Sequence, residues 1–240
     1  MLDILKLDAD VTQEVEKDSL GGGGVMATDI YGFTIKAAYF DFSKGKAMSV
    51  NLKLESDTGR KLNVQEYITS GEAKGCKPYY EKDGKKFPLP GYSKMNTLCQ
   101  LATGKPINEL TAEEKILKLY DFDAKAETNQ TKKVIVELTG AKIQAGVFKI
   151  IENKRKNMAG QGEKADYQPT EETREINEVD KFFNEDGKTL EEIVSKKDAN
   201  FAEEWLKAHQ GKTKDKTVKV AGGATAGAPM GAGTATLSFS

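Results

Sequence analysis

Three stretches in the first third of the chain alternate apolar and polar side chains, which is the pattern of β-strands with one buried face. Apolar residues recur at every second position over residues 31–40, 48–54 and 62–68. Two short polar segments, 43–46 and 57–59, lie between these stretches, and each contains a glycine that favours a tight turn. The pattern therefore predicts three consecutive strands.

The next part of the chain predicts a hairpin, one helix and two more strands. Residues 79–87 resemble a hairpin around Asp83-Gly84, and residues 92–102 carry an apolar stripe with helical spacing that ends before Gly104. Apolar runs then predict strands at 133–138 and 145–153. The order β-β-β-α-β-β predicts a mainly β protein with added helices, built on a five-stranded OB-fold barrel, a fold that binds oligonucleotides and oligosaccharides.

The segments on either side of this barrel differ from it in composition. Residues 1–29 predict an acidic arm that ends in a tetraglycine linker, and residues 30–158 are assigned to the barrel. Residues 159–210 predict a linker followed by an acidic helical arm, with helices at 171–184 and 189–208. The Gly/Ala-rich segment 211–240 predicts a flexible tail.

Charge is unevenly distributed along a chain whose formal net charge is only −1. Residues 30–165 carry a net charge of +8, whereas residues 1–29 carry −5 and residues 166–210 carry −7. A basic centre with acidic flanks favours a polyanionic ligand, and the acidic arm would compete with that ligand. The alternative is that the charge pattern only serves solubility.

Several functions are disfavoured by what the chain lacks. No apolar run is long enough to span a membrane, and no secretory signal is evident at the N-terminus. The two cysteines, Cys76 and Cys99, make no disulfide framework, so we expect a cytoplasmic protein with Cys99 in the core. A single histidine, His209, argues against zinc and against a catalytic triad. The sequence predicts no enzyme, no metal site and no cofactor.

The candidate chemistry lies in aromatic residues that alternate with lysines. Aromatic rings stack on the faces of unpaired bases, and cationic side chains neutralise phosphates, so this combination is typical of proteins that bind single-stranded nucleic acid. The predicted DNA-binding residues are Lys36, Lys53, Arg60, Lys61, Tyr67, Tyr79, Tyr80, Lys82, Lys85, Lys86 and Phe87. The alternative is that the aromatic residues only pack the hairpin, with Phe87 anchored in the core, and that the lysines are simply solvated.

The segment from Tyr79 to Cys99 resembles phage-encoded single-stranded DNA-binding proteins. The shared runs there are Tyr-Tyr-Glu-Lys-Asp-Gly-Lys-Lys from Tyr79, Leu-Pro-Gly-Tyr from Leu89 and Met-Asn-Thr-Leu-Cys from Met95. The runs Tyr-Gly-Phe-Thr-Ile from Tyr31 and Trp-Leu-Lys from Trp205 are similar too, so the resemblance extends over residues 28–210. It implies a protein of the host cytoplasm that coats single-stranded DNA in phage replication and recombination. Many such proteins end in an acidic tail that recruits partners. Here the last segment is neutral to basic, although Phe239 lies near the end.

A second function stays open at this stage. The barrel could instead be a protein-interaction module that acts as a replication or transcription cofactor, for example on an RNA polymerase. The predicted partners are therefore single-stranded DNA and, through the C-terminal arm or tail, phage or host replication, recombination or transcription proteins. No contact with a membrane is predicted.

Overall fold

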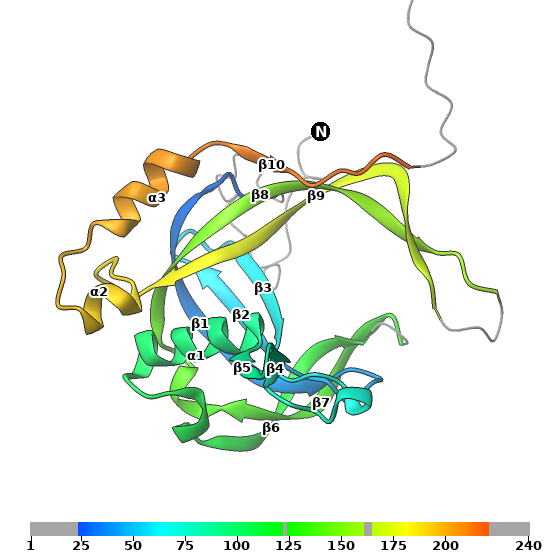
Figure 1. Cartoon of the computed structure of the whole chain (residues 1–240), viewed down its shortest axis with the longest axis horizontal. Helices are drawn as coiled ribbons and strands as arrows, with labels where there is room; N and C mark the ends of the chain where they lie inside the picture. The colour runs from blue at the N-terminus through cyan, green and yellow to red at the C-terminus, as the bar shows by residue number, and fades with distance from the viewer. Residues whose placement is uncertain (1–23, 122–123, 161–164, 221–240) are drawn as a thin grey trace, which may run out of the picture.

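The computed structural model describes residues 24–121, 124–160 and 165–220 (Figure 1). The predicted arm as far as residue 23, the centre of the predicted linker and the tail from residue 221 lie outside the described residues. The described protein is mainly β. Its strands are β1 (Asp29–Phe42), β2 (Met48–Ser56), β3 (Lys61–Tyr67), β4 (Tyr79–Lys82), β5 (Lys85–Pro88), β6 (Ala112–Asp121), β7 (Ala126–Ile135), β8 (Lys142–Asn157), β9 (Tyr167–Phe183) and β10 (Thr213–Asp215).

The helices are few and short. They are α1 (Pro90–Thr103), α2 (Leu190–Val194) and α3 (Phe201–His209), together with the 3-10 turns η2 (Glu72–Lys74), η3 (Ile107–Glu109) and η4 (Val136–Leu138). Within the described ranges, none of the helices has the length and apolar character needed to cross a bilayer.

The long strand β1 organises the main sheet. One edge of β1 pairs antiparallel with β2, which in turn pairs with β3. The other edge pairs with β8 through residues 29–34 and with β7 through residues 39–40. Strand β9 lies beyond β8, and together they form the long ribbon that extends away from the sheet in Figure 1. The path β3-β2-β1-β8-β9 is thus one curved, open antiparallel sheet.

Helix α1 covers the space between the two ends of this sheet, β3 and β9. Its Lys94 ammonium donates to the Glu66 carboxylate of β3 at 2.6 Å and to the Val179 carbonyl of β9, so one side chain ties the two ends together. Gly91 makes the close approach to β3 possible, because a Cβ at this position would lie 2.3 Å from the Tyr67 carbonyl oxygen.

The main core lies between the concave side of the sheet and α1. Its largest fully buried side chains come from both, and include Phe33, Ile35, Leu52, Leu54, Met95, Leu98, Ile143 and Phe182. Cys99 is fully buried, which confirms the prediction that it is a core residue. Burial raises the pKa of the Cys99 thiol to about 12, so the thiol stays protonated and unreactive at neutral pH.

The structure confirms the first three predicted strands, the β4–β5 hairpin, helix α1 and the strand predicted at 145–153. The strand predicted at 133–138 is wrong in part, because β7 ends at Ile135 and η4 follows. The hairpin formed by β6 and β7 was not predicted. Most of its residues are exposed on both faces, so its sequence has too few apolar positions to show the two-residue period of a strand.

The helix predicted at 171–184 is wrong, since residues 171–183 belong to β9. The buried positions Val179 and Phe182 are three residues apart, which suggests a helical period. The structure shows a β-bulge instead: Val147 pairs with Val179 and Gly146 with Lys181, so Asp180 is an extra residue in the ladder. A bulge adds one residue between two inward positions and thereby imitates the helical spacing.

The segments predicted to flank the barrel are in fact joined to the sheet. Strand β9 lies beyond the boundary predicted at residue 158, yet it supplies Val179 and Phe182 to the core. Met26 is also buried, and its amide donates to Asn177 of β9 at 2.8 Å. Strand β10 pairs in parallel with β8, so the predicted flexible tail does not begin at residue 211.

Three of the 13 carboxylates of residues 166–210 form ion pairs with lysines of this sheet or next to it. Glutamates of β9 form ion pairs with neighbouring strands, at 2.8 Å for Lys149–Glu175, 2.9 Å for Lys154–Glu172 and 2.6 Å for Lys216–Glu178. Carboxylates fixed in this way are not free to compete for a ligand elsewhere. These three glutamates of β9 therefore neutralise Lys149 and Lys154 of β8 and Lys216, which follows β10.

The second helix of the predicted arm is present as two short helices. Thr189 and Glu192 form a capping box at the start of α2, and the Glu192 carboxylate also accepts from the amides of Asn200 and Phe201, at the start of α3. Burial opposes the ionisation of Glu192, but these hydrogen bonds and that from the Thr189 amide outweigh it and lower its pKa to about 2. Glu192 is thus the residue that joins α2 to α3.

Glu192→Gln is expected to destabilise the protein at pH 7 by about 1–3 kcal/mol, because buried amide donors lose a charged acceptor. The ordinary pKa of glutamate is 4.5 and the folded value is about 2, so this contribution is present above pH 4.5 and is lost as the pH falls towards 2. Urea unfolding at pH 7 and pH 3 measures the difference. Glu191→Gln, at an exposed neighbour, is the matched control, and an equal loss in both variants would contradict the role of Glu192.

Candidate nucleic-acid interface

The side of β1, β2 and β3 that faces away from the core carries polar residues in register, and we call it the outer face. Cross-strand pairs on it include Ser49 with Tyr67, Asn51 with Gln65 and Lys53 with Asn63. The intervening residues, such as Leu52 and Val64, point into the core. The outer face consists of Ala37, Tyr39, Asp41, Ser49, Asn51, Lys53, Glu55, Lys61, Asn63, Gln65 and Tyr67.

Hydrogen bonds hold the amides of the outer face in fixed orientations. Gln65 donates from Nε2 to Asn51 Oδ1 at 3.0 Å, and Asn51 donates from Nδ2 to Ser49 Oγ at 3.0 Å. A groove of about 290 Å³ follows this row, bordered on the far side by Leu119 and Tyr120 of β6. Amides lying in such a groove can donate to and accept from the edges of an unpaired base.

Strand β6 reaches the groove because Leu119 packs against Ala37 and Tyr39 of β1. Burial, and then the nearby Asp41 carboxylate, raise the pKa of the Tyr39 hydroxyl. Tyr39 therefore remains a neutral phenol at physiological pH, with a hydroxyl that can donate a hydrogen bond.

The outer face carries two lysines and two carboxylates, and lysines from outside the face neutralise the carboxylates. Its two carboxylates are already paired, Asp41 with Lys132 at 2.7 Å and Glu55 with Lys36 at 3.5 Å. In contrast, Lys53 and Lys61 take part in none of the ion pairs formed among the described residues. These two lysines can therefore pair with an added anion without breaking an internal contact.

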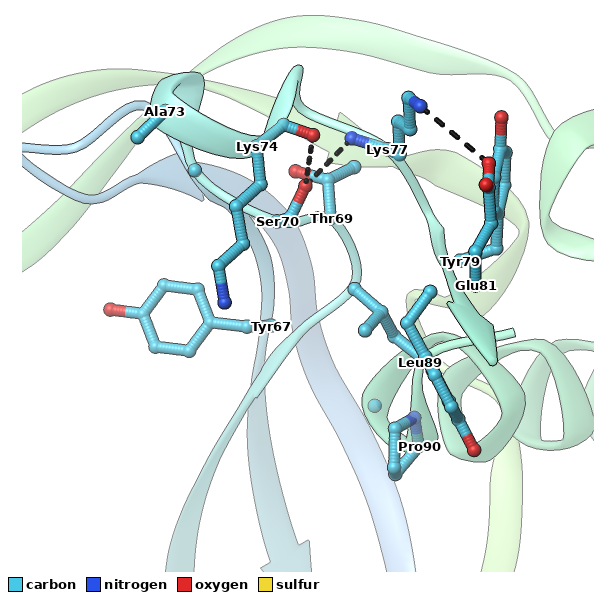
Figure 2. Close-up of a pocket in the computed structure, with 13 residues that line it drawn as sticks. Tyr67, Thr69, Ser70, Ala73, Lys74, Lys77, Tyr79, Glu81, Leu89 and Pro90 are labelled. Atoms are coloured by element: carbon cyan, nitrogen blue, oxygen red, sulfur yellow. Dashed lines mark hydrogen bonds and ion pairs between the residues drawn. The ribbon is translucent and has the colours of Figure 1, made fainter. Parts of the chain in front are cut away.

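A larger pocket of about 640 Å³ opens at the end of the outer face marked by Tyr67, and we call it the tyrosine pocket (Figure 2). Tyr67 lies on one side of it and Tyr79 on the other, and Leu89 and Pro90 lie between them (Figure 2). The lining residues are Tyr67, Thr69, Ser70, Gly71, Ala73, Lys74, Lys77, Tyr79, Tyr80, Glu81, Leu89, Pro90 and Gly91.

The loop between β3 and β4 brings two lysines to this pocket. It is fixed to the β1–β2 turn, because the Glu72 amide donates to the Gly45 carbonyl at 2.8 Å and the Glu72 carboxylate pairs with Lys46 at 2.6 Å. Lys74 extends from this loop towards Tyr67 (Figure 2). Lys77 lies 5.5 Å from the centre of the Tyr79 ring, which is cation–π distance.

The β4–β5 hairpin supplies the other aromatic residues. Its turn places Asp83 and Gly84 at positive φ, as a tight two-residue hairpin requires. The Tyr80 and Phe87 rings stack on each other with their centres 5.6 Å apart, yet they remain 46% and 40% exposed. Phe87 is therefore not anchored in the core, and the pair presents apolar surface to an incoming ligand.

The structure brings together only some of the predicted DNA-binding residues. Tyr67, Tyr79 and Tyr80 line one pocket, and Lys86 lies 4.9 Å from the Tyr79 ring centre. Other predicted residues lie elsewhere: Lys82 and Lys85 at the hairpin tip, Lys36 and Lys53 on β1 and β2, and Arg60 and Lys61 at the opposite end of β3 from Tyr67. That strand has 7 residues, so its ends are about 20 Å apart.

Several site residues were not predicted. Lys74 and Lys77 lie in a loop whose position depends on contacts with the distant β1–β2 turn, which no local pattern signals. The strand alternation places Asn51, Asn63 and Gln65 on the outward face of two predicted strands, but these residues were not predicted to bind DNA.

The candidate interface is thus a polar strand surface of about 20 Å that leads into a pocket lined with aromatic residues. No protein-family model matches the chain, and no curated protein is significantly similar to it. The functional inference therefore depends on the geometry and chemistry of these residues.

Proposed function

We propose that this protein binds and coats single-stranded DNA without strong sequence preference, in phage DNA replication and recombination. The observation that carries the proposal is the tyrosine pocket, where Tyr67, Tyr79 and Tyr80 surround one opening beside Lys74 and Lys77. Rings that are accessible and flanked by cations suit a ligand made of flat bases joined by phosphates.

The sheet order supports an OB-type barrel as the scaffold. In such a barrel the strand after the helix pairs with the first strand, and the last strand approaches the third. Here β6 and β7 intervene after α1 as an added hairpin, and β8 then pairs with β1. Strand β9 pairs with β8, and α1 joins β9 to β3 through Lys94. On this assignment β9 is the fifth strand, and the outer face of β2 and β3 is the surface on which this fold binds oligonucleotides.

The chemistry of the site favours single strands over duplex. Stacking on a tyrosine contributes roughly 1–3 kcal/mol per base, but only where the base face is accessible, and a duplex buries these faces between neighbouring pairs. Lysines along the path neutralise phosphates and release counterions, so they add affinity independently of sequence. The combination gives tight binding with weak base selectivity.

A fluorescence titration with labelled oligonucleotides tests the proposal. We expect single strands of unrelated sequence to bind with similar affinity, and a duplex of equal length to bind much more weakly. If the site contacts about six phosphates, a rise in salt from about 50 to 200 mM should weaken single-strand binding by roughly 10²–10³-fold. Equal affinity for duplex, or binding that is indifferent to salt, would contradict the proposal.

A further inference from the structure

Among the strands that the structure describes, β7 alone pairs with β6, so the other edge of β6 is open over residues 112–119. In Figure 1 the strand lies at the rim of the molecule. At 10 residues it is long for an edge strand, and its central residue Ile116 is 71% exposed. An exposed edge with an apolar centre is a template for pairing with another strand.

We propose that β6 pairs antiparallel with β6 of a second copy of this chain, centred on Ile116. A two-fold axis perpendicular to the sheet keeps corresponding faces together, so each candidate register pairs some residue with its own copy. These registers differ in the side chains that they place opposite one another, and therefore in their stability. This inference does not depend on the DNA-binding proposal.

The register centred on Ile116 is the one that satisfies both charge and apolar contacts. It places Ile116 opposite Ile116 of the second copy, and Glu114 opposite Lys118 twice, because the symmetry repeats the pair. Opposite charges directly across a strand pair are stabilising. The side chains of Glu114, Ile116 and Lys118 share the face on which all three are exposed.

The neighbouring registers are opposed by like charges. Centring on Lys115 or Lys118 places two ammonium groups opposite each other, and centring on Glu114 does the same with two carboxylates. Centring on Leu117 places Glu113 opposite Asp121 twice. Like charges directly opposite are destabilising, so these alternatives are disfavoured.

The internal contacts of β6 leave this register accessible. Lys118 pairs with Glu127 of β7 at 3.2 Å, but both side chains are more than half exposed, so this pair adds little stability and Lys118 can be shared. Leu119 and Tyr120 of the same strand border the groove of the outer face. A β6 dimer would therefore hold two such grooves in one particle.

Sedimentation velocity on the full chain tests the pairing. We expect a dimer, with Glu114→Lys and Lys118→Glu each raising the dissociation constant about tenfold or more, since each creates two like-charge contacts. The double variant restores opposite charges and should return the dissociation constant to near that of the parent. A chain that stays monomeric up to about 100 µM, or a dimer unaffected by either reversal, would overturn the proposal.

Disulfide trapping tests the register itself. In a Cys76→Ser background, Ile116→Cys should form a covalent dimer on mild oxidation, because directly opposed Cα atoms lie about 4.5–5.5 Å apart, within disulfide range. Glu113→Cys is the matched control on the same exposed strand. Its two copies would be about 20 Å apart, so it should not crosslink. Equal crosslinking of both variants, or none of Ile116→Cys, would overturn the register.

Discussion

Replacing both Tyr67 and Tyr79 with alanine is expected to weaken single-stranded DNA binding by at least about 30-fold. Each ring removed costs roughly 1–3 kcal/mol of stacking, and 1.4 kcal/mol is a factor of ten in affinity. The two rings lie on opposite sides of one pocket, so their loss removes two of the three tyrosine rings that line it without touching the core (Figure 2). The dependence of affinity on salt should stay the same, because the lysines that neutralise phosphates are unchanged.

A variant that removes charge at the same pocket should instead change the dependence of affinity on salt. Lys74→Ala with Lys77→Ala is expected to lower the salt slope by about 0.7 for each phosphate that is no longer neutralised. The conservative changes Tyr67→Phe and Tyr79→Phe keep the rings and serve as matched controls that should bind like the parent. If the alanine variants remain folded and bind as tightly as the parent, the tyrosine pocket is not the DNA site.

The sequence predicted the strands whose two faces differ sharply in environment. In β2 and β3, core residues such as Leu52 and Val64 alternate with polar outer-face residues, so the two-residue period is clear. Tyr67 was identified for the same reason, as an aromatic residue at an outward position. The local sequence pattern is therefore sufficient to predict a strand that has one solvent-exposed face and one buried face.

Local pattern failed where tertiary contacts decide the structure. The bulge at Asp180 changed the spacing of buried residues in β9, and only the pairing with β8 reveals it. The loop that carries Lys74 is held by the Gly45 carbonyl, which is 27 residues from Glu72 in the chain. The separation of Arg60 from the pocket follows equally from the direction of β3, since residues that are close in sequence lie at opposite ends of one strand.

The attachment of α3 to the sheet provides the largest expected effect on stability. Trp205 is 3% exposed, its ring centre lies 5.3 Å from that of Phe148, and its indole N–H donates to the Asp180 carboxylate at 2.8 Å. Gly146 of β8 lies directly beneath the ring, where a Cβ would be 3.0 Å from it. The bulged residue, the glycine and the tryptophan thus form one packing unit.

Trp205→Ala is expected to cost about 3–5 kcal/mol, the usual effect of removing a large buried ring. Gly146→Ala should cost about 1–3 kcal/mol, because the added methyl group displaces the indole. In the double variant that clash disappears with the ring, so the combined loss should be clearly smaller than the sum of the two. Urea unfolding of the parent, the two single variants and the double variant measures this double-mutant cycle. Strictly additive losses would show that Gly146 and Trp205 are not coupled, and that α3 is attached to the sheet by other contacts.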